Sequence, residues 1–190
     1  MNLQLTKLLS ICALAVLTAC ASPAEFQNMV VTDGIDTVKS ENSAWNRSIT
    51  VAHVDGGEET NPLWTSEISS DAFKKALIAS LKNAGLLGED EGASNYKVRA
   101  TLLEVDQPLF GLNFTVETRI RYEVIDNNTE SVVFDQEVPA SHTATFGDSP
   151  FAIQRLRLAN EGAAKNNIAA FIEKLLDEGP TPSTTNVVVK

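Results

Sequence analysis

The residues best suited to hold a metal ion are the chain's two histidines, His53 and His142. With one of the acidic residues Asp55, Glu58 or Glu59 they would make a minimal zinc set, because Zn²⁺ takes imidazole nitrogen and carboxylate oxygen ligands. Nothing in their spacing brings the two histidines together, and a lone histidine in a strand more often packs or hydrogen-bonds. We therefore predict no metal site and no cofactor.

Ser149, in the sequence Gly147-Asp148-Ser149, is the one candidate nucleophile with a recognisable context. Some lipases and esterases carry a Gly-Asp-Ser nucleophile early in the domain with a histidine base far downstream, whereas no histidine follows Ser149. The same residues ahead of Pro150 are typical of a helix start, with a capping side chain and a proline in the first turn. We therefore predict no catalytic residue. An enzyme acting on lipid or acyl groups through Ser149 is the alternative.

Both cysteines lie in the first 20 residues, a segment with the features of a signal peptide. Lys7 precedes the apolar run Leu8–Leu17, which is too short for a permanent membrane span. The run ends in Leu17-Thr18-Ala19-Cys20, which resembles the bacterial lipobox: a branched apolar residue, two small residues and an obligatory cysteine. The alternative is an ordinary secretory signal in which Cys20 is an accidental neighbour.

The lipobox resemblance implies a fate for this part of the chain. In lipoproteins of that kind the signal, here residues 1–19, is removed and the cysteine thiol, here that of Cys20, is joined to a diacylglycerol. Several acyl chains hold a protein firmly to a membrane. Ala21, rather than aspartate, follows Cys20, and this implies sorting to the outer membrane, on its periplasmic face.

The charge of the chain argues against a nucleic-acid partner. With 15 Lys and Arg against 25 Asp and Glu, the formal charge is -10 and the pI about 4.6, so the surface repels a polyanion. Removal of residues 1–19 from 190 would leave 171 and take away only the charge of Lys7, giving -11. Cys12 would leave with the signal and Cys20 would carry lipid, so we expect no free thiol and no disulfide.

Residue patterns predict six regular elements in the order strand, helix, strand, strand, strand, helix. The clearest strand is Phe114–Val124, where apolar and polar residues alternate. One helix is expected from a cap at Thr65 or Ser66 to Gly85, and another from Asp148-Ser149-Pro150 to Gly179. The remaining strands are expected at Arg47–Val54, Tyr96–Val105 and Ser131–Phe146, with a turn at Asp126–Thr129 and an edge position or a bulge at Pro139.

Each predicted helix has one apolar stripe and the predicted sheet one apolar face. The fold class is therefore α+β: two helices packed on one face of a four-stranded, mainly antiparallel sheet. We predict that the chain is divided into a removed signal (1–19), the lipidated cysteine with a polar tether (20–46), a single domain (47–178) and a flexible tail (179–190).

The loop Pro108–Leu112 is the first candidate for contact with a partner. It places Leu109, Phe110 and Leu112 where a turn is normally polar, and exposed apolar groups in a loop mark a protein or membrane contact. The alternative is that Phe110 folds back over the helices. The open sheet face and the edge strand around Pro139 are further candidate docking surfaces.

Three segments together resemble small uncharacterised proteobacterial outer-membrane lipoproteins: Phe73–Leu81, Phe114–Val124 and Arg155–Ala163. Some of those carry the automatic name UDP-N-acetylglucosamine acyltransferase, an enzyme built from hexapeptide repeats that this sequence lacks. The element order is also similar to that of the lipopolysaccharide-assembly lipoprotein, although a shared fold does not transfer function. Taken together, the lipobox and the lack of catalytic motifs lead us to predict a lipid-anchored periplasmic binding or accessory lipoprotein, without catalysis, in envelope assembly, maintenance or transport. It would contact the membrane through Cys20 and bind an envelope protein.

Overall fold

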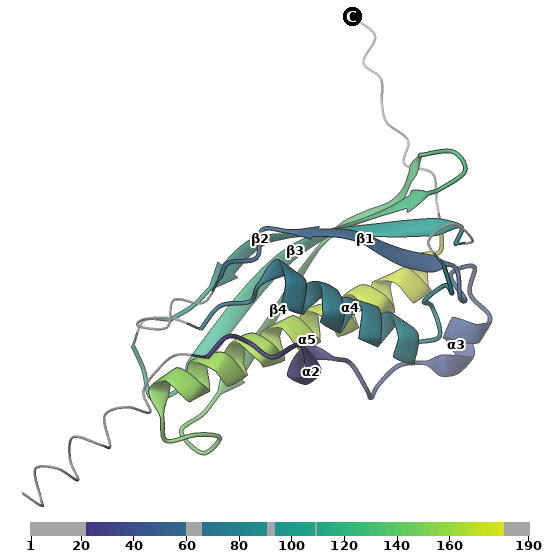
Figure 1. Ribbon diagram of the computed structural model, residues 1–190. Helices are drawn as coiled ribbons and strands as arrows, with labels where there is room; N and C mark the ends of the chain where they lie inside the picture. The colour runs from purple at the N-terminus through teal and green to yellow at the C-terminus, as the bar shows by residue number, and fades with distance from the viewer. Residues whose placement is uncertain (1–21, 60–65, 91–93, 109, 181–190) are drawn as a thin grey trace, which may run out of the picture.

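The computed structural model describes residues 22–59, 66–90, 94–108 and 110–180. Their elements are α2 (Phe26–Met29), α3 (Thr37–Glu41), β1 (Ile49–Asp55), α4 (Ser70–Asn83), β2 (Tyr96–Asp106), β3 (Phe114–Asp126), β4 (Val132–Ala144) and α5 (Ala152–Glu178). The strands form one sheet in the order β1-β2-β3-β4, and α4 and α5 lie along one face of it (Figure 1). The predicted fold class and element order are confirmed.

Strand direction follows from the connections between the strands. β1 pairs with β2 in parallel, since α4 carries the chain back to the start of the sheet, whereas β2, β3 and β4 pair antiparallel through short connections. In β3 buried and exposed residues alternate from Phe114 to Tyr122, so one face meets the helices and the other meets solvent. Pro139 lies on β4, an edge strand as predicted, where a missing amide donor disrupts no ladder on the outer side.

The helix ends differ in part from prediction. Ser69, rather than Thr65 or Ser66, caps α4 by accepting a hydrogen bond from the Ala72 amide at 3.2 Å. Gly85 follows the helix with φ +70°, as expected of a glycine after a C-cap. The predicted cap on α5 is wrong: the helix starts at Ala152, and its N-cap, Phe151, makes no side-chain cap.

The stretch 20–46, predicted as a tether, is part of the domain over its described residues 22–46. Trp45 and Met29 are fully buried and Val31 is 2% exposed, all within the core between the helices and the sheet. The Trp45 indole donates to the Leu175 carbonyl at 2.7 Å, which ties this segment to the last turn of α5. The prediction failed because these apolar residues have no helical or strand period, although each of them fills a place in the core.

A buried polar group crosses the core between α5 and the sheet. The Asn167 side chain accepts from the Tyr122 hydroxyl at 2.8 Å and donates to the Val138 carbonyl at 2.8 Å and the Thr118 hydroxyl at 3.1 Å. The Tyr122 ring stacks on Phe171 at 3.9 Å, and burial raises the pKa of the Tyr122 phenol well above its ordinary value. These bonds fix how α5 lies across β3 and β4.

Candidate functional site

Two of the predicted site residues, Cys20 and Leu109, lie outside the described residues. The chain enters the described part of the fold at Ser22, whose carbonyl accepts from the Ser66 hydroxyl at 2.8 Å. The Ser66 carbonyl in turn accepts from the buried Asn160 amide of α5 at 2.6 Å. Two residues further, the Ala24 amide donates to the Glu67 carbonyl at 3.2 Å. Ser22 is therefore bonded into the domain.

A buried carboxylate on α5 holds the next turn of the N-terminal segment. The Glu161 oxygens accept from the Glu25 amide at 2.9 Å and from the Asn28 side chain at 3.0 Å, and Arg157 lies 3.7 Å from one of them. The i, i+4 spacing of Arg157 and Glu161 is that of a surface pair, yet Glu161 is 2% exposed because the segment covers it. Burial raises the pKa of Glu161, with its hydrogen bonds and Arg157 acting in the opposite direction.

Four large apolar side chains protrude from two neighbouring loops, and we call them the apolar tip. Phe110 (89% exposed) and Leu112 (76%) come from the β2–β3 loop, and Phe146 (56%) and Phe151 (71%) from the β4–α5 loop. The loops adjoin because Phe114 and Ala144 pair in the sheet. The Phe146 amide also donates to the Asn113 side-chain oxygen at 3.4 Å. The alternative, in which Phe110 folds back over the helices, does not occur, since its side chain is exposed.

A buried arginine lies beneath the tip. Arg155, 4% exposed, places its guanidinium 5.3 Å from the Phe114 ring centroid and 5.5 Å from that of Phe146. It donates to the Ser149 carbonyl at 2.7 Å, so one side chain links α5, the end of β3 and the β4–α5 loop. Sequence reasoning missed this residue, because arginine near the start of a helix is normally solvated.

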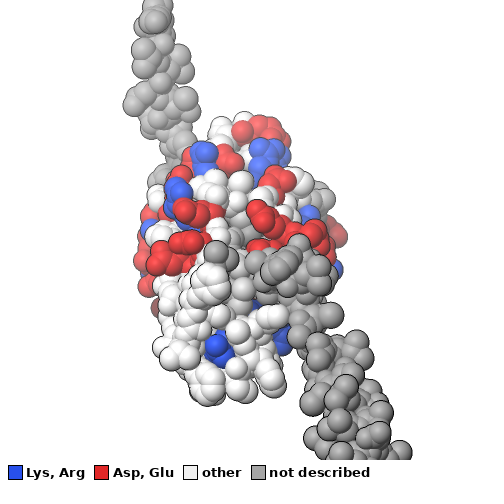
Figure 2. Space-filling model, turned by 90° about the vertical axis from the view of Figure 1, so that its left-hand side faces the viewer, with Lys and Arg blue, Asp and Glu red and all other residues white. Residues whose placement is uncertain are grey.

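The end of the molecule that carries the tip has few charges. Residues 107–113 contain no charged side chain and residues 145–151 contain only Asp148, in a chain of which 21% is charged. The Asp148 carboxylate accepts from the Thr145 amide at 2.6 Å and hydroxyl at 2.8 Å, bonds that lower its pKa. Figure 2 looks onto this end, where a mostly white surface, with some basic atoms visible in it, lies below a belt of acidic and basic side chains.

The apolar tip and Ser22 lie at the same end of the domain. Gln107, the first residue of the β2–β3 loop, donates to the Glu67 carboxylate at 2.7 Å. The backbone carbonyl of Glu67 accepts from the Ala24 amide. Asn160, which holds Ser66 and through it Ser22, lies in the third turn of α5, about 12 Å along the helix from its start. In Figure 1 the start of the described chain, the β2–β3 loop and the start of α5 gather together.

The Ser149 side chain is buried in the turn before α5 and hydrogen-bonded to its neighbours there. It is 3% exposed, and its hydroxyl donates to the Gln154 side chain at 2.8 Å and accepts from the Phe151 amide at 3.2 Å. Neither partner is a general base. The hydroxyl therefore shapes the turn that leads into α5.

The two histidines do not meet. His53 lies on β1 and His142 on β4, at opposite edges of the sheet, so at least three strand spacings of about 4.8 Å separate them. His53 pairs with Asp55 at 2.8 Å, while the His142 ring packs so closely on Gly162 that a Cβ there would lie 2.2 Å from it. Among the described residues no three His, Cys, Asp or Glu side chains form a metal-binding group.

The open sheet face, a predicted docking surface, is covered by paired charges. Arg119 bonds Glu104 at 2.7 Å and Glu137 at 3.2 Å, and Arg121 bonds Asp135 at 2.7 Å. Bonding to Asp135 raises the pKa of Arg121, and bonding to Arg121 lowers that of Asp135. A shallow hollow of about 410 Å³ lies along this face near Pro139. Exposed pairs of this kind add little stability, and they make this face polar.

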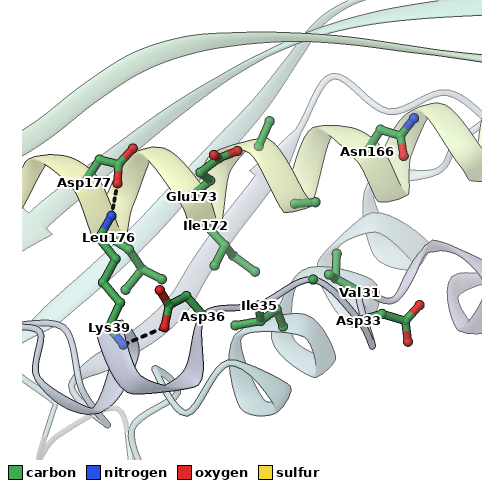
Figure 3. Close-up of a pocket in the computed structure, with 13 residues that line it drawn as sticks. Val31, Asp33, Ile35, Asp36, Lys39, Asn166, Ile172, Glu173, Leu176 and Asp177 are labelled. Atoms are coloured by element: carbon green, nitrogen blue, oxygen red, sulfur yellow. Dashed lines mark hydrogen bonds and ion pairs between the residues drawn. The ribbon is translucent and has the colours of Figure 1, made fainter.

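A groove of about 470 Å³ lies between the N-terminal segment and the C-terminal half of α5 (Figure 3). Its apolar floor includes Ile35, Ile172 and Leu176, and an ion pair between Lys39 and Asp177 crosses its rim. Bonding to Asp177 raises the pKa of Lys39. Asp33, Asp36 and Glu173 also line the groove, so its lining has more acidic than basic side chains.

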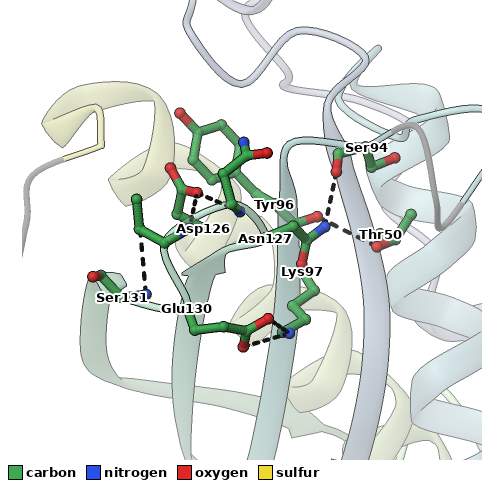
Figure 4. Close-up of polar contacts among 10 residues, drawn as sticks. Thr50, Ser94, Tyr96, Lys97, Asp126, Asn127, Glu130 and Ser131 are labelled. Atoms are coloured by element: carbon green, nitrogen blue, oxygen red, sulfur yellow. Dashed lines mark hydrogen bonds and ion pairs between the residues drawn. The ribbon is translucent and has the colours of Figure 1, made fainter.

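The end opposite the tip is closed by polar contacts (Figure 4). The predicted turn at Asp126–Thr129 is present, and the Asp126 carboxylate accepts from the Asn128 and Thr129 amides at 2.8 and 3.1 Å. Lys97 bonds Glu130 at 2.9 Å. Glu130, the residue after this turn, has a positive φ of 55°. This end therefore has the charge and hydrogen bonding of an ordinary solvated surface.

No protein-family model and no curated protein sequence matches the chain. Among solved structures, a Xanthomonas campestris protein assigned to the family DUF330 has 12% identity and a TM-score of 0.52, over 72% of this chain and 89% of its own. A Caulobacter crescentus protein classed as a lipoprotein has 15% identity and a TM-score of 0.48 (70% and 91% covered). A minor lipoprotein of Acinetobacter baumannii has 9% and 0.47 (73% and 98%).

The likeness to the Xanthomonas protein shows a shared fold. None of these three neighbours carries the acyltransferase name. Within the part of the chain that the structure describes, no helix has the length and apolar character needed to cross a bilayer.

Proposed function

We propose that the protein is a lipid-anchored accessory lipoprotein at the periplasmic face of the outer membrane. It acts without catalysis, by binding an envelope protein in assembly, maintenance or transport. The observation that carries the proposal is the position of Ser22, which is bonded into the domain two residues after Cys20. A diacylglycerol on that cysteine would hold the folded domain itself, rather than a long tether, at the membrane.

The surroundings of Ser149 support a role in binding over a role in catalysis. A serine nucleophile needs a base within hydrogen-bond reach, and the Ser149 hydroxyl is engaged by Gln154 and Phe151. The protein instead offers exposed apolar side chains at one end and paired charges on its open sheet face. Such surfaces are suited to contact with a membrane or a protein.

Metabolic labelling with palmitate tests the anchor, and the chain supplies its own control. The native protein and a Cys12→Ser variant should take up label and show processing that globomycin blocks, because Cys12 lies in the removed signal. Cys20→Ser should lose both. A Cys20→Ser protein that still takes up palmitate, or a native protein without label, would overturn the proposal.

Substitution of Ser149 tests the enzymatic alternative. Ser149→Ala should weaken the turn before α5 and leave any acyl-hydrolase activity of the preparation unchanged. Complete loss of a measured activity, with the circular-dichroism spectrum and melting temperature retained, would establish the enzyme and contradict the binding role. Crosslinking in the native envelope should then capture a specific envelope protein with the native chain.

A further inference from the structure

We propose that the apolar tip, formed by Phe110, Leu112, Phe146 and Phe151, is a membrane-contacting surface. Its side chains enter the boundary between headgroups and acyl chains in the leaflet that holds the lipid on Cys20. The inference rests on the proposed function, because that lipid brings the tip to the bilayer. It adds a second attachment, made by the protein itself, which fixes the orientation of the domain.

The length of chain before Ser22 leaves the domain little freedom. Two residues of extended chain span about 7 Å at most, so the lipidated cysteine would lie within that distance of Ser22. Ser22 cannot move far from the domain, since its carbonyl is held by Ser66 and Ala24 is held by Glu67. The end of the domain that carries Ser22 must therefore lie against the bilayer.

The tip lies at that same end. The β2–β3 loop begins at Gln107, which is bonded to Glu67 beside the entering chain. The β4–α5 loop adjoins it through the bond from the Phe146 amide to Asn113. Four protruding apolar side chains from two loops thus meet the membrane as a consequence of where the chain enters the fold (Figure 1).

The chemistry of this end suits a lipid surface better than the rest of the molecule does. Phenylalanine and leucine are residues with which peripheral proteins enter the headgroup and acyl boundary. The two loops carry one charged side chain, Asp148, and its carboxylate is bonded to Thr145. The remainder of this acidic protein is repelled by anionic headgroups, so the uncharged end is the one that can approach them.

The tip is also held in shape before it meets a membrane. The Arg155 guanidinium lies against the Phe114 and Phe146 rings and bonds the Ser149 carbonyl, which keeps the β4–α5 loop on the end of the sheet. The apolar side chains are therefore displayed by the fold without first being released from the core, and insertion needs little reordering.

A fluorophore on a single cysteine tests the proposal in the lipidated protein. The mature chain has no other free thiol once Cys20 carries lipid, so Leu112→Cys can be labelled alone with an environment-sensitive dye. In vesicles of phosphatidylethanolamine and phosphatidylglycerol, nitroxide groups on the acyl chains should quench this dye at least twofold. The same dye at Asn128→Cys, an exposed position on the β3–β4 turn at the opposite end, should keep its intensity.

A second pair of variants separates insertion from mere proximity. In the Leu112→Cys protein, Phe146→Asp with Phe151→Asp should remove at least half of the quenching, because two charges would have to leave water. Val38→Asp should leave it unchanged, since Val38 is also an exposed apolar residue (68%) but lies on α3, away from the tip.

Three results would overturn the inference. One is equal, weak quenching at positions 112 and 128 in a protein that carries palmitate. That result would contradict membrane contact by the tip but not the proposed function. Another is shielding of position 112 in native envelopes but not in lipid vesicles, which assigns the tip to a protein partner. The third is shielding that grows with protein concentration in detergent, which assigns it to contact between copies. Loss of palmitate on the native protein contradicts the proposed function instead.

Discussion

Replacement of Trp45 tests whether the N-terminal segment belongs to the fold. Trp45 is fully buried, its ring meets that of Tyr96 edge-on with centroids 4.8 Å apart, and its indole donates to the Leu175 carbonyl. Truncation of a buried tryptophan to alanine leaves a large cavity and typically costs about 3–5 kcal/mol. Trp45→Ala should therefore lower the free energy of unfolding by about that amount.

Two further variants show how much of this loss comes from the buried ring and how specific it is to Trp45. Trp45→Phe should cost about 1–2 kcal/mol, because the ring is largely kept and the Leu175 carbonyl still accepts from the Gly179 amide at 3.3 Å. Val38→Ala, in the same segment but 68% exposed, should change stability by less than about 0.5 kcal/mol.

Urea unfolding of the detergent-solubilised protein, followed by far-ultraviolet circular dichroism, measures all three variants without using the tryptophan signal as a probe. If residues 22–46 were a tether outside the fold, Trp45→Ala and Val38→Ala would change the free energy of unfolding by similar small amounts. A loss below about 0.5 kcal/mol for Trp45→Ala would refute the packing of this segment and, with it, the short connection from Cys20 to the domain.

Three further positions, the buried Glu161 and Tyr122 and the half-buried Gly162, are tested by the same unfolding assay. Burial raises the pKa of Glu161 above its ordinary 4.5, so the stability it contributes is complete below that pH and is lost as the pH rises through its folded-state pKa. The advantage of the native protein over Glu161→Gln should accordingly shrink as the pH rises above 4.5; a constant or growing advantage contradicts this. Gly162→Ala should destabilise the native protein but stabilise a His142→Ala protein by about 0.5–1 kcal/mol, because the three atoms nearest to the added Cβ all belong to the imidazole ring and its removal frees the usual gain in helix propensity. Equal effects in both backgrounds would show that the ring moves freely. Tyr122→Phe should cost about 1–3 kcal/mol, since the buried Asn167 oxygen loses its donor, and a neutral effect would place water there instead.

The elements with a clear period were predictable, and the segments without one were not. The alternation of apolar and polar residues in β3 and the glycine after α4 are local patterns that predict a strand and a helix end, and the folded protein has both. Residues 22–46 give none, because their two helices are short and Trp45 is buried by contact with α5, far away in the sequence. A segment of this kind can be recognised only once the surface that it covers is known.

The same limit applies to the candidate site. Two of the exposed tip residues, Phe110 and Leu112, were identified from the apolar character of the β2–β3 loop. Their neighbours Phe146 and Phe151 were not, because one was assigned to a strand and the other to a helix. Arg155 was missed for a related reason, since only the folded molecule places its guanidinium between two rings. The signal that could have joined them is the shared lack of charge in residues 107–113 and 145–151.

The short connection to Cys20 changes what the negative charge of the protein would do. On a long tether, a mature charge of -11 would push the domain away from anionic lipid. If the lipid were fixed within about 7 Å of Ser22, the domain could not move away, and repulsion would turn its charged parts away from the bilayer. Burial of the apolar tip would favour the same orientation. The paired charges of the open sheet face and the polar β3–β4 turn would then remain accessible to an envelope partner, so membrane contact and partner binding would use different parts of the domain.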